Sequence, residues 1–213
     1  MSKPRAENYG DYLKIPALLE LQNTVTEAHD ELQFIVVHQA FELWFKLALF
    51  ELEAARSAIS NDEVPRAMHL LKRVEAIFRN LIPSFDVMET MRPADFLEFR
   101  EELKPASGLQ SSQFREIEYI CGLRDERYLS LQNETIRERL KMRLDEPSLW
   151  DAFLTLMDRY DLARSTEKEV IDSLIKVMRE PDHHPLSPLV DQLIAFDELF
   201  GLWRTRHVQM VMR

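Results

Sequence analysis

The sequence predicts an all-α helical bundle in a single domain, and three observations lead to this prediction. Only four of the 213 residues are glycine, so few positions suit the tight turns that join β-strands. Apolar residues recur every three or four positions along most of the chain, and no useful stretch alternates with period two. A chain of this length can bury a sizeable core, so we expect residues 1–213 to form one helical domain.

The first helices are predicted from caps and from the absence of helix breakers. A polar N-terminal arm precedes a short amphipathic helix over residues 15–21. Thr26 is a plausible N-cap, because acidic residues follow it in the first turns. No proline or glycine lies between Thr26 and Ile59, and this predicts one long helix of about nine turns at 3.6 residues per turn.

The remaining helices are separated by segments rich in proline or glycine. Asn61 or Asp62 caps the next helix, and Pro93 occupies the first-turn position of the one that follows. Loops are expected at residues 104–109 and 182–188. The helices predicted over this part of the chain are 62–83, 94–103, 111–121, 134–144, 147–160, 166–179 and 189–213.

Composition restricts the classes of partner and compartment. The formal net charge of −10 argues against a nucleic-acid partner, because phosphate binding requires a positive field. The single cysteine, Cys121, suits a reducing compartment, and Met1–Tyr9 lacks the apolar core of a signal peptide. The longest purely apolar runs, Phe34–Val37 and Leu47–Phe50, are far shorter than the ~20 residues of a membrane span. We therefore expect a cytoplasmic protein with no membrane partner.

His38 is the first candidate functional residue. At helical spacing it shares one face of the long helix with Phe34, Phe41 and Phe45. An imidazole among aromatic rings can line a pocket as a base or a hydrogen-bond donor. It can equally be a core histidine bonded to a backbone or side-chain partner, and spacing alone favours this second interpretation.

A second group of candidates combines a cation, a ring and a small hydroxyl. Arg100 lies one turn after Phe96, and a guanidinium can bind an amino-acid carboxylate through two parallel hydrogen bonds. The alternative is a surface salt bridge to Glu101 or Glu102, which is the commoner situation for arginine. Ser107 in the following loop either approaches a ligand closely or belongs to a simple turn.

His207 is the candidate metal ligand. It lies on the last helix, one turn after Trp203, and an imidazole with apolar neighbours can ligate haem iron through one nitrogen. Arg204 and Arg206 are close enough in sequence to pair with haem propionates. The alternative is an ordinary core or surface histidine, and the sequence alone favours that interpretation.

Taken together, the segments that carry these residues resemble the tryptophan 2,3-dioxygenase family. The resemblance extends from about residue 9 to residue 213 and is weakest between residues 122 and 190. The matching blocks occur in the family's order and are Tyr9–Lys14, Asp30–Lys46, Phe96–Arg100 with Pro105–Arg115, and Leu202–Arg213.

The resemblance implies a fold, a cofactor and a reaction. Members of this family are all-helical homotetramers that bind haem b, with its iron, non-covalently and use O2 as co-substrate. They cleave the C2–C3 bond of the indole ring of L-tryptophan to give N-formyl-L-kynurenine, in tryptophan catabolism through the kynurenine pathway. The resemblance therefore implies a haem-binding dioxygenase domain over residues 1–213.

Roles for individual residues are also implied by the resemblance. His207 is expected to be the axial ligand of the haem iron, and His38 the residue that hydrogen-bonds the indole N–H. Phe34 is expected to pack on the indole ring, while Arg100 binds the substrate carboxylate. The other expected substrate-site residues are Phe96 and Phe114 along the pocket, Ser107 above the haem, and Tyr9, Tyr12 and Leu13, which reach a neighbouring subunit's site.

This sequence departs from the family pattern at two points. Some members have tyrosine where Phe96 or Phe114 stands, so a hydroxyl contact is lost. The family's substrate-covering loop, rich in Gly, Ser and Thr, does not follow the ligand helix before Arg213, so it is either outside this sequence or absent. Two alternatives therefore stay open: a related haem monooxygenase acting on a tryptophan derivative, and a non-enzymatic haem-binding relative.

Overall fold

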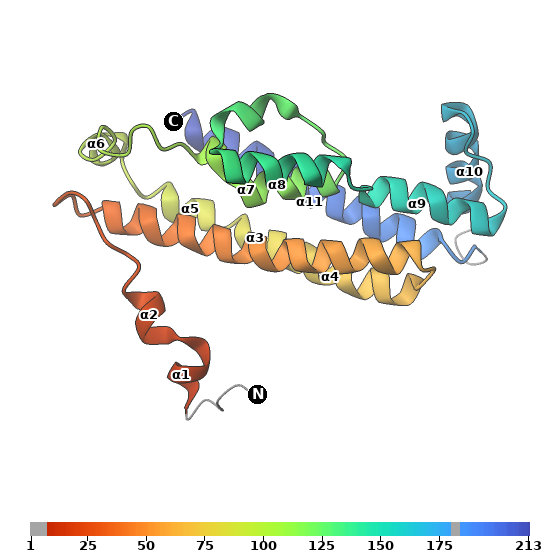
Figure 1. Ribbon diagram of the computed structural model, residues 1–213, viewed down its shortest axis with the longest axis horizontal. Coiled ribbons are helices and arrows are strands. Elements are labelled where there is room, and N and C mark those ends of the chain that lie inside the picture. The colour runs from red at the N-terminus through yellow and green to blue at the C-terminus, as the bar shows by residue number, and fades with distance from the viewer. Residues whose placement is uncertain (1–7, 180–183) are drawn as a thin grey trace.

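The computed structural model describes residues 8–179 and 184–213, and these residues form helices, turns and loops without a β-strand (Figure 1). The all-α prediction is therefore confirmed. The elements are α1 (Tyr9–Leu13), α2 (Ile15–Leu19), α3 (Glu31–Ser60), α4 (Val64–Leu81), α5 (Ser84–Met88), α6 (Pro93–Leu97), η1 (Gly108–Gln110), α7 (Ser112–Ile120), η2 (Glu126–Leu131), α8 (Glu134–Asp145), α9 (Leu149–Met157), η3 (Asp158–Tyr160), α10 (Glu167–Arg179) and α11 (Ser187–Val211).

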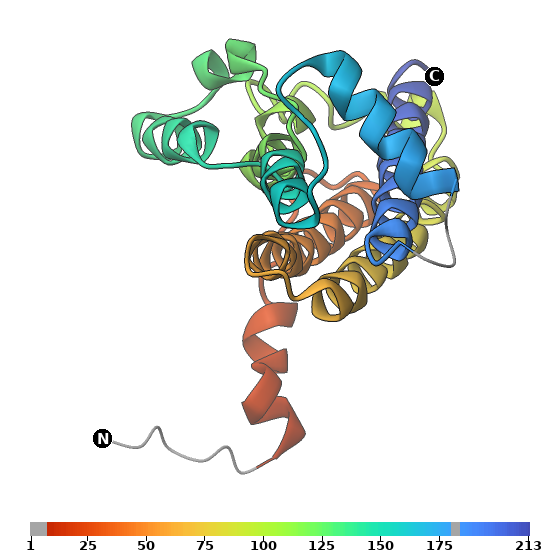
Figure 2. The same ribbon diagram turned by 90° about the vertical axis from the view of Figure 1, so that its right-hand side faces the viewer.

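The long helix α3 is the centre of the bundle. It packs against α4, α7 and α9, and α11 lies against α4 (Figures 1 and 2). The core between these helices is unusually aromatic, and burying each such side chain stabilises the fold by about 1.5–3 kcal/mol. The largest aromatic cluster joins α3, α4, α5, α7 and α11 and consists of Phe41, Phe45, Phe78, Phe85, Phe114, Phe196, Phe200 and Trp203.

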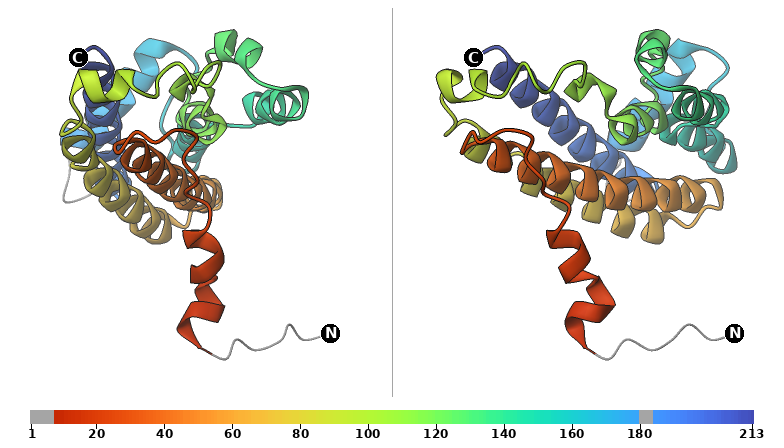
Figure 3. Two further views of the ribbon diagram at one scale, coloured as in Figure 1. Left: turned by 90° about the vertical axis from the view of Figure 1, so that its left-hand side faces the viewer. Right: turned by 60° about the vertical axis from the view of Figure 1, so that its left-hand side comes forward.

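The N-terminal arm leaves the bundle instead of packing on it. Helices α1 and α2 project away from the other helices, as the views in Figures 2 and 3 agree. The polar arm before residue 15 contains a short helix that was not predicted, and Asn8 caps it by accepting a hydrogen bond from the Asp11 backbone N–H (2.9 Å). Five residues form this extra helix, α1.

The long helix begins five residues later than Thr26, so the predicted N-cap is wrong. Thr26 instead donates its hydroxyl hydrogen to the Glu31 carboxylate (2.6 Å). The same carboxylate accepts the backbone N–H groups of Val25 (2.7 Å) and Thr26 (2.8 Å). Glu31 is only 1% exposed, and it fastens the turn before α3 rather than leaving Thr26 free to start a helix. The other end of α3, Ser60, lies within one residue of the prediction.

The helix predicted for residues 94–103 is also shorter than expected. It ends at Leu97, and the chain continues in successive turns with hydrogen bonds three residues apart, such as Glu102 N–H to the Phe99 carbonyl (3.1 Å). Phe99 is buried, and its ring meets the ring of Phe96 edge-on at 5.4 Å. Both rings pack on Phe34, and this contact favours the tighter turns over a continued α-helix.

Helix α3 is long and apolar enough, by length and composition, to cross a membrane. Core helices of soluble proteins pass the same test, and one face of α3 is buried in the bundle. Its opposite face is exposed and also apolar. The exposed residues on that face are Leu32, Val36, Leu43, Trp44, Leu47 and Phe50.

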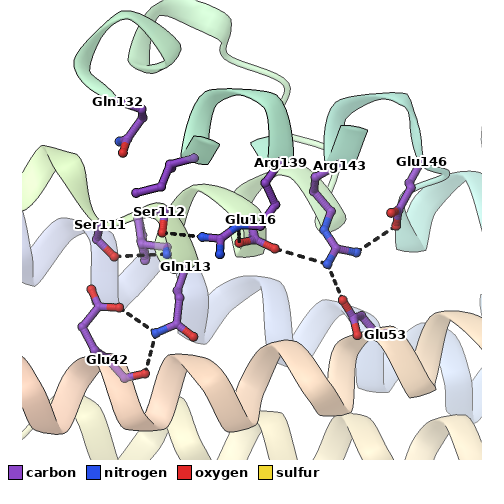
Figure 4. A network of polar contacts seen from close by, with 12 residues as sticks. Glu42, Glu53, Ser111, Ser112, Gln113, Glu116, Gln132, Arg139, Arg143 and Glu146 are labelled. Carbon is purple, nitrogen blue, oxygen red and sulfur yellow. Dashed lines mark hydrogen bonds and ion pairs between the residues drawn. The ribbon is translucent and has the colours of Figure 1, made fainter. Parts of the chain in front are cut away.

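A network of ion pairs fastens α8 to α3 and α7 (Figure 4). Arg143 on α8 contacts Glu53 of α3, Glu116 of α7 (3.2 Å) and Glu146 (2.8 Å). Arg139, one turn earlier, contacts the other carboxylate oxygen of Glu116 (3.1 Å). The network therefore fixes how α7 lies on α3, and α7 also contributes to the aromatic cluster.

Candidate functional site

His38 lies at the half-buried end of α3, with its ring 4.0 Å from the ring of Phe34. Its Nδ1 is 2.7 Å from the Phe34 backbone oxygen. A carbonyl oxygen only accepts, so Nδ1 donates and the other ring nitrogen, Nε2, carries a free lone pair. Burial lowers the pKa of His38 below its ordinary value, although the Phe34 hydrogen bond and the charge of Glu42 oppose this effect. The imidazole is therefore neutral at pH 7.

His207 lies near the C-terminal end of α11, with its ring parallel to the indole of Trp203 at 5.3 Å and an interplanar angle of 6°. The ring of Phe85 is 6.1 Å away. Burial lowers the pKa of His207, and the positive charge of Arg115 lowers it further. His207 is thus also neutral at pH 7, and it lies within electrostatic range of His38.

A layer of three aromatic side chains connects the two histidines. Phe41, one turn after His38, meets that ring edge-on at 6.3 Å. It also contacts Trp203 (5.9 Å) and Phe85 (5.4 Å), which both neighbour His207. Although His38 and His207 lie far apart in the sequence, the fold brings them to the same end of the bundle, on helices α3 and α11.

Phe96 lies beside Phe34, and Arg100 lies beside Phe96. The rings of Phe96 and Phe34 are 5.9 Å apart, and the Arg100 guanidinium carbon lies 5.9 Å from the centre of the Phe96 ring. Arg100 is exposed, and within residues 8–179 and 184–213 it forms no ion pair. The alternative of a salt bridge to Glu101 is not seen, because Glu101 pairs with Lys104 (2.7 Å).

Ser107 and Phe114 lie in different surroundings. Ser107 is exposed and caps the short helix η1, where its hydroxyl oxygen accepts the Leu109 N–H (3.3 Å). Phe114 is buried on α7, with its ring 4.7 Å from Trp203. Phe114 therefore lies next to the Trp203 end of the aromatic layer, whereas Phe96 lies next to Phe34 near His38.

The arm residues are not brought to these histidines within one chain. Tyr9 and Tyr12 on α1 are each 76% exposed, and Leu13 is also exposed. Helix α1 projects away from the bundle in both views of Figure 3. Their expected place in a neighbouring subunit's site stays a prediction.

Comparison with known proteins identifies the family. A family model described as tryptophan 2,3-dioxygenase matches residues 2–167, which is most of the chain. The chain belongs to the tryptophan 2,3-dioxygenase family. A relative from Nocardioides sp., named tryptophan 2,3-dioxygenase, is 45% identical over 215 residues that cover 96% of this chain and 80% of the relative.

Two further relatives of the same name are similar over the same extent. The protein from Herpetosiphon aurantiacus is 41% identical over 228 residues, with 98% of this chain and 86% of the relative covered. The protein from Bradyrhizobium diazoefficiens is 39% identical over 225 residues, with 98% and 81% covered. The resemblance inferred from four sequence blocks is thereby confirmed across nearly the whole chain.

For this member of the tryptophan 2,3-dioxygenase family, the structure adds two buried N–H donors that sequence reasoning missed. Arg115 Nε and Trp203 Nε1 are both buried and have no hydrogen-bond partner among the described residues. The Arg115 guanidinium lies between the rings of Phe114 (5.0 Å) and Tyr128 (4.0 Å), and it pairs with Glu118 (2.6 Å). Arg115 ends one of the matching blocks, but nothing in the sequence indicated that its guanidinium is buried.

The two arginines proposed from sequence as propionate partners are engaged elsewhere. Arg206 contacts Asp86 (3.1 Å) and Glu89 (3.3 Å), so its charge is already compensated. Arg204 lies 3.6 Å from Glu118. The unpartnered buried donors are Arg115 Nε and Trp203 Nε1. Trp203 stacks on His207, and Arg115 is linked to Trp203 through Phe114, so these two donors replace Arg204 and Arg206 as candidates.

Proposed function

We propose that this chain is a haem-dependent dioxygenase that cleaves the C2–C3 bond of L-tryptophan with O2 to give N-formyl-L-kynurenine. One observation carries the proposal: two imidazoles from distant helices lie at one end of the bundle and are linked by a continuous aromatic layer. Relatives that are named for this activity are similar over nearly the whole chain.

The residues around His207 fit haem b. This cofactor carries two carboxylates at one edge of an apolar ring, so its site needs an axial ligand, aromatic walls and buried donors for anions. His207 supplies the ligand, and the aromatic layer supplies the walls. Arg115 Nε and Trp203 Nε1 are unpartnered buried donors of the kind that a carboxylate satisfies. Haem, when bound, supplies the activation of dioxygen.

His207 is suited to ligation because it stays unprotonated. A metal ligand must offer a lone pair, and burial together with the positive charge of Arg115 keeps the pKa of His207 low. The parallel stack on Trp203 also restricts the orientation of the ring. We assign His207 as the iron ligand.

His38 is suited to orienting the substrate. Because Nδ1 donates to the Phe34 carbonyl, Nε2 is a fixed acceptor that can receive the indole N–H. The hydrogen bond determines which nitrogen carries the proton, so His38 orients the indole without having to transfer a proton. Phe34, in contact with the His38 ring, offers an aromatic surface for the indole.

Arg100 is the proposed partner of the substrate carboxylate. Its guanidinium has no ion-pair partner among the described residues, and it lies over Phe96, beside Phe34 and His38. A guanidinium can bind a carboxylate through two hydrogen bonds, and this fixes the amino-acid end of tryptophan relative to its ring. Ser107 and Phe114 complete the set of proposed site residues.

We further propose a cytoplasmic homotetramer that binds neither nucleic acid nor a membrane. The exposed apolar face of α3 is large enough to suggest that another protein surface covers it, and Tyr9, Tyr12 and Leu13 on the projecting arm are positioned to reach another subunit. The net charge of −10 opposes binding to phosphate backbones.

The proposal is tested by spectroscopy and by product mass. The purified chain is reconstituted with haem, reduced, and given L-tryptophan and oxygen. We expect a Soret band that shifts when tryptophan is added, and a product heavier than tryptophan by both oxygen atoms of O2. A product with one added oxygen would indicate a monooxygenase, and haem binding without turnover would indicate a non-enzymatic relative.

A further inference from the structure

Arg115 is held by groups on three sides. The guanidinium lies 4.0 Å from the centre of the Tyr128 ring and 5.0 Å from that of Phe114. Glu118, one turn later on α7, forms an ion pair with Nη1 at 2.6 Å. We call the side chains of Phe114, Glu118 and Tyr128 the Arg115 clamp. Together they leave Nε as the buried donor without a partner.

The segment that carries Tyr128 is itself anchored. Arg137 on α8 donates hydrogen bonds to the backbone oxygens of Leu129 (3.1 Å) and Gln132 (2.9 Å). The hydroxyl of Tyr119 on α7 donates a hydrogen bond to the backbone oxygen of Asp125 (3.0 Å). Helix η2 is therefore tied to both α7 and α8, and Tyr128 covers the guanidinium from a fixed position, next to a surface hollow of about 400 Å³.

Charged side chains of both signs surround the clamp. Arg115 and Arg204 both face the carboxylate of Glu118, at 2.6 Å and 3.6 Å, so two positive groups share one negative group. Asp125 is close by, but it pairs with Arg127 (2.6 Å). Within the described residues the acidic side chains of Glu118, Asp125 and Glu126 thus balance the charges of Arg115, Arg127 and Arg204. The group that an anion can still satisfy is the buried Nε of Arg115, which has no hydrogen-bond partner among these residues.

We propose that Glu118 and Tyr128 are positioning residues that hold the Arg115 guanidinium in the orientation that retains haem. This inference rests on the proposed function, because the anion is taken to be a haem carboxylate. A guanidinium fixed before binding loses little rotamer freedom when the carboxylate arrives, so the clamp slows haem dissociation. Neither residue needs to touch haem for this effect.

The test measures the rate at which haem leaves the full-length holoprotein for an excess of a haem-scavenging apoglobin. Tyr128→Ala removes the ring over the guanidinium, and we expect haem to leave about tenfold faster, the size expected for a desolvated cation–π contact. Tyr128→Phe is the matched control, because no described residue bonds to the Tyr128 hydroxyl and the ring is kept. Its rate should stay within about twofold of the parent rate.

Repeating the Tyr128→Ala measurement in a variant that lacks Arg115 shows whether Tyr128 acts through Arg115. Arg115→Met combined with Glu118→Gln removes the cation without leaving a buried charge unpaired, so this variant should fold. In this background Tyr128→Ala should add no further acceleration, because the group that it holds is gone. Glu118→Gln alone keeps an acceptor oxygen for Nη1, and its rate should be closer to the parent rate than that of Glu118→Ala.

The possible results separate this inference from the proposed function. The clamp would be overturned if the Tyr128→Ala variant and the parent lost haem at the same rate. It would also be overturned if Tyr128→Ala accelerated haem loss equally with and without Arg115. Neither result would contradict the proposal that the protein binds haem. The clamp would also be overturned if Tyr128→Phe accelerated haem loss as much as Tyr128→Ala does. A parent protein that takes up no haem would instead overturn the proposed function.

Discussion

The two faces of helix α7 meet very different polar surroundings. Glu116 and Arg115 are adjacent, and each is 6% exposed. Both carboxylate oxygens of Glu116 contact arginines, at 3.1 Å from Arg139 and 3.2 Å from Arg143 (Figure 4). Arg115 has a single ion pair, to Glu118, and its Nε is buried without a partner in the described chain.

This difference distinguishes a structural network from a binding site. Leaving a buried polar group unsatisfied costs about 1–3 kcal/mol, so a fold keeps such a group where a ligand later satisfies it. The Glu116 side of α7 is fully paired and joins helices, whereas the Arg115 guanidinium packs on Phe114, whose ring contacts Trp203. Mutations on the Glu116 side of α7 should therefore lower the stability of the fold, and mutations on the Arg115 side should lower the affinity for the ligand.

The largest expected effect is on the ligand side of this contrast. His207→Ala removes the proposed iron ligand, so we expect haem affinity to fall by more than about a hundredfold, beyond the 10- to 100-fold typical of residues that only support a ligand. A haem titration followed at the Soret band measures the affinity. His38→Ala should weaken turnover but keep haem, and His69→Ala, at an exposed position, is the neutral control. Similar Soret titrations for His207→Ala and the parent would contradict the assignment.

The network side should respond in stability instead. Arg143→Ala removes contacts to Glu53, Glu116 and Glu146 and leaves Glu116 with one partner, so we expect the free energy of unfolding to fall by about 3 kcal/mol. Urea denaturation measures this change. Arg66→Ala breaks an exposed pair with Glu63 and should cost less than about 1 kcal/mol. If Arg143→Ala released haem at a temperature where the chain stays folded, the separation of the two faces would fail.

The sequence predicted helices well where their ends are capped locally. Ser111 accepts the Phe114 N–H (3.2 Å), and α7 spans Ser112–Ile120 inside the predicted 111–121. The prediction failed where another interaction competes for the capping side chain, as at Thr26, whose hydroxyl donates to Glu31. It failed likewise beyond Leu97, where packing of Phe96 and Phe99 on Phe34 replaces the α-helix by tighter turns.

The same distinction holds for the candidate site. His38 and His207 could be chosen from residue type, helical neighbours and the resemblance to a family, and the fold brings them within electrostatic range of each other. Arg115 could not be chosen, because most arginines are solvated and its burial depends on Tyr128 from a separate segment. Arg204 and Arg206 looked suitable only because their carboxylate partners lie far away in the sequence.

A smaller effect is expected at the exposed edge of the site. Arg100→Ala should raise KM for tryptophan about 30-fold and change kcat little, as expected for losing about 2 kcal/mol of carboxylate binding. Steady-state kinetics measures both constants. Arg92→Ala is the matched control, because Arg92 is also exposed but already pairs with Asp95 (2.5 Å). A fall in kcat with unchanged KM would show that Arg100 acts after binding, and the carboxylate assignment would then be wrong.

The smallest effect should follow a change at Glu31, which resembles Glu116 in being buried and fully bonded. Glu31→Gln places an amide NH2 against the Val25 or Thr26 N–H, so these two amides should exchange hydrogen with solvent faster, while haem affinity stays unchanged. Exchange measured by NMR tests this, with Glu27→Gln at an exposed position as the control. A drop in haem affinity would show that a satisfied carboxylate can also support the ligand site.

The pH dependence of this last effect has a definite sign. The Thr26 hydroxyl, followed by the Val25 backbone N–H, lowers the pKa of Glu31 below its ordinary value, so the folded state binds its proton less tightly than the unfolded state does. The stabilising contribution is therefore complete above the unfolded pKa of about 4.3 and disappears as pH falls through the folded pKa. Parent and Glu31→Gln exchange rates should converge in acid, because protonated Glu31 resembles the amide. A difference that persisted unchanged at low pH would mean that shape rather than charge fixes the turn before α3.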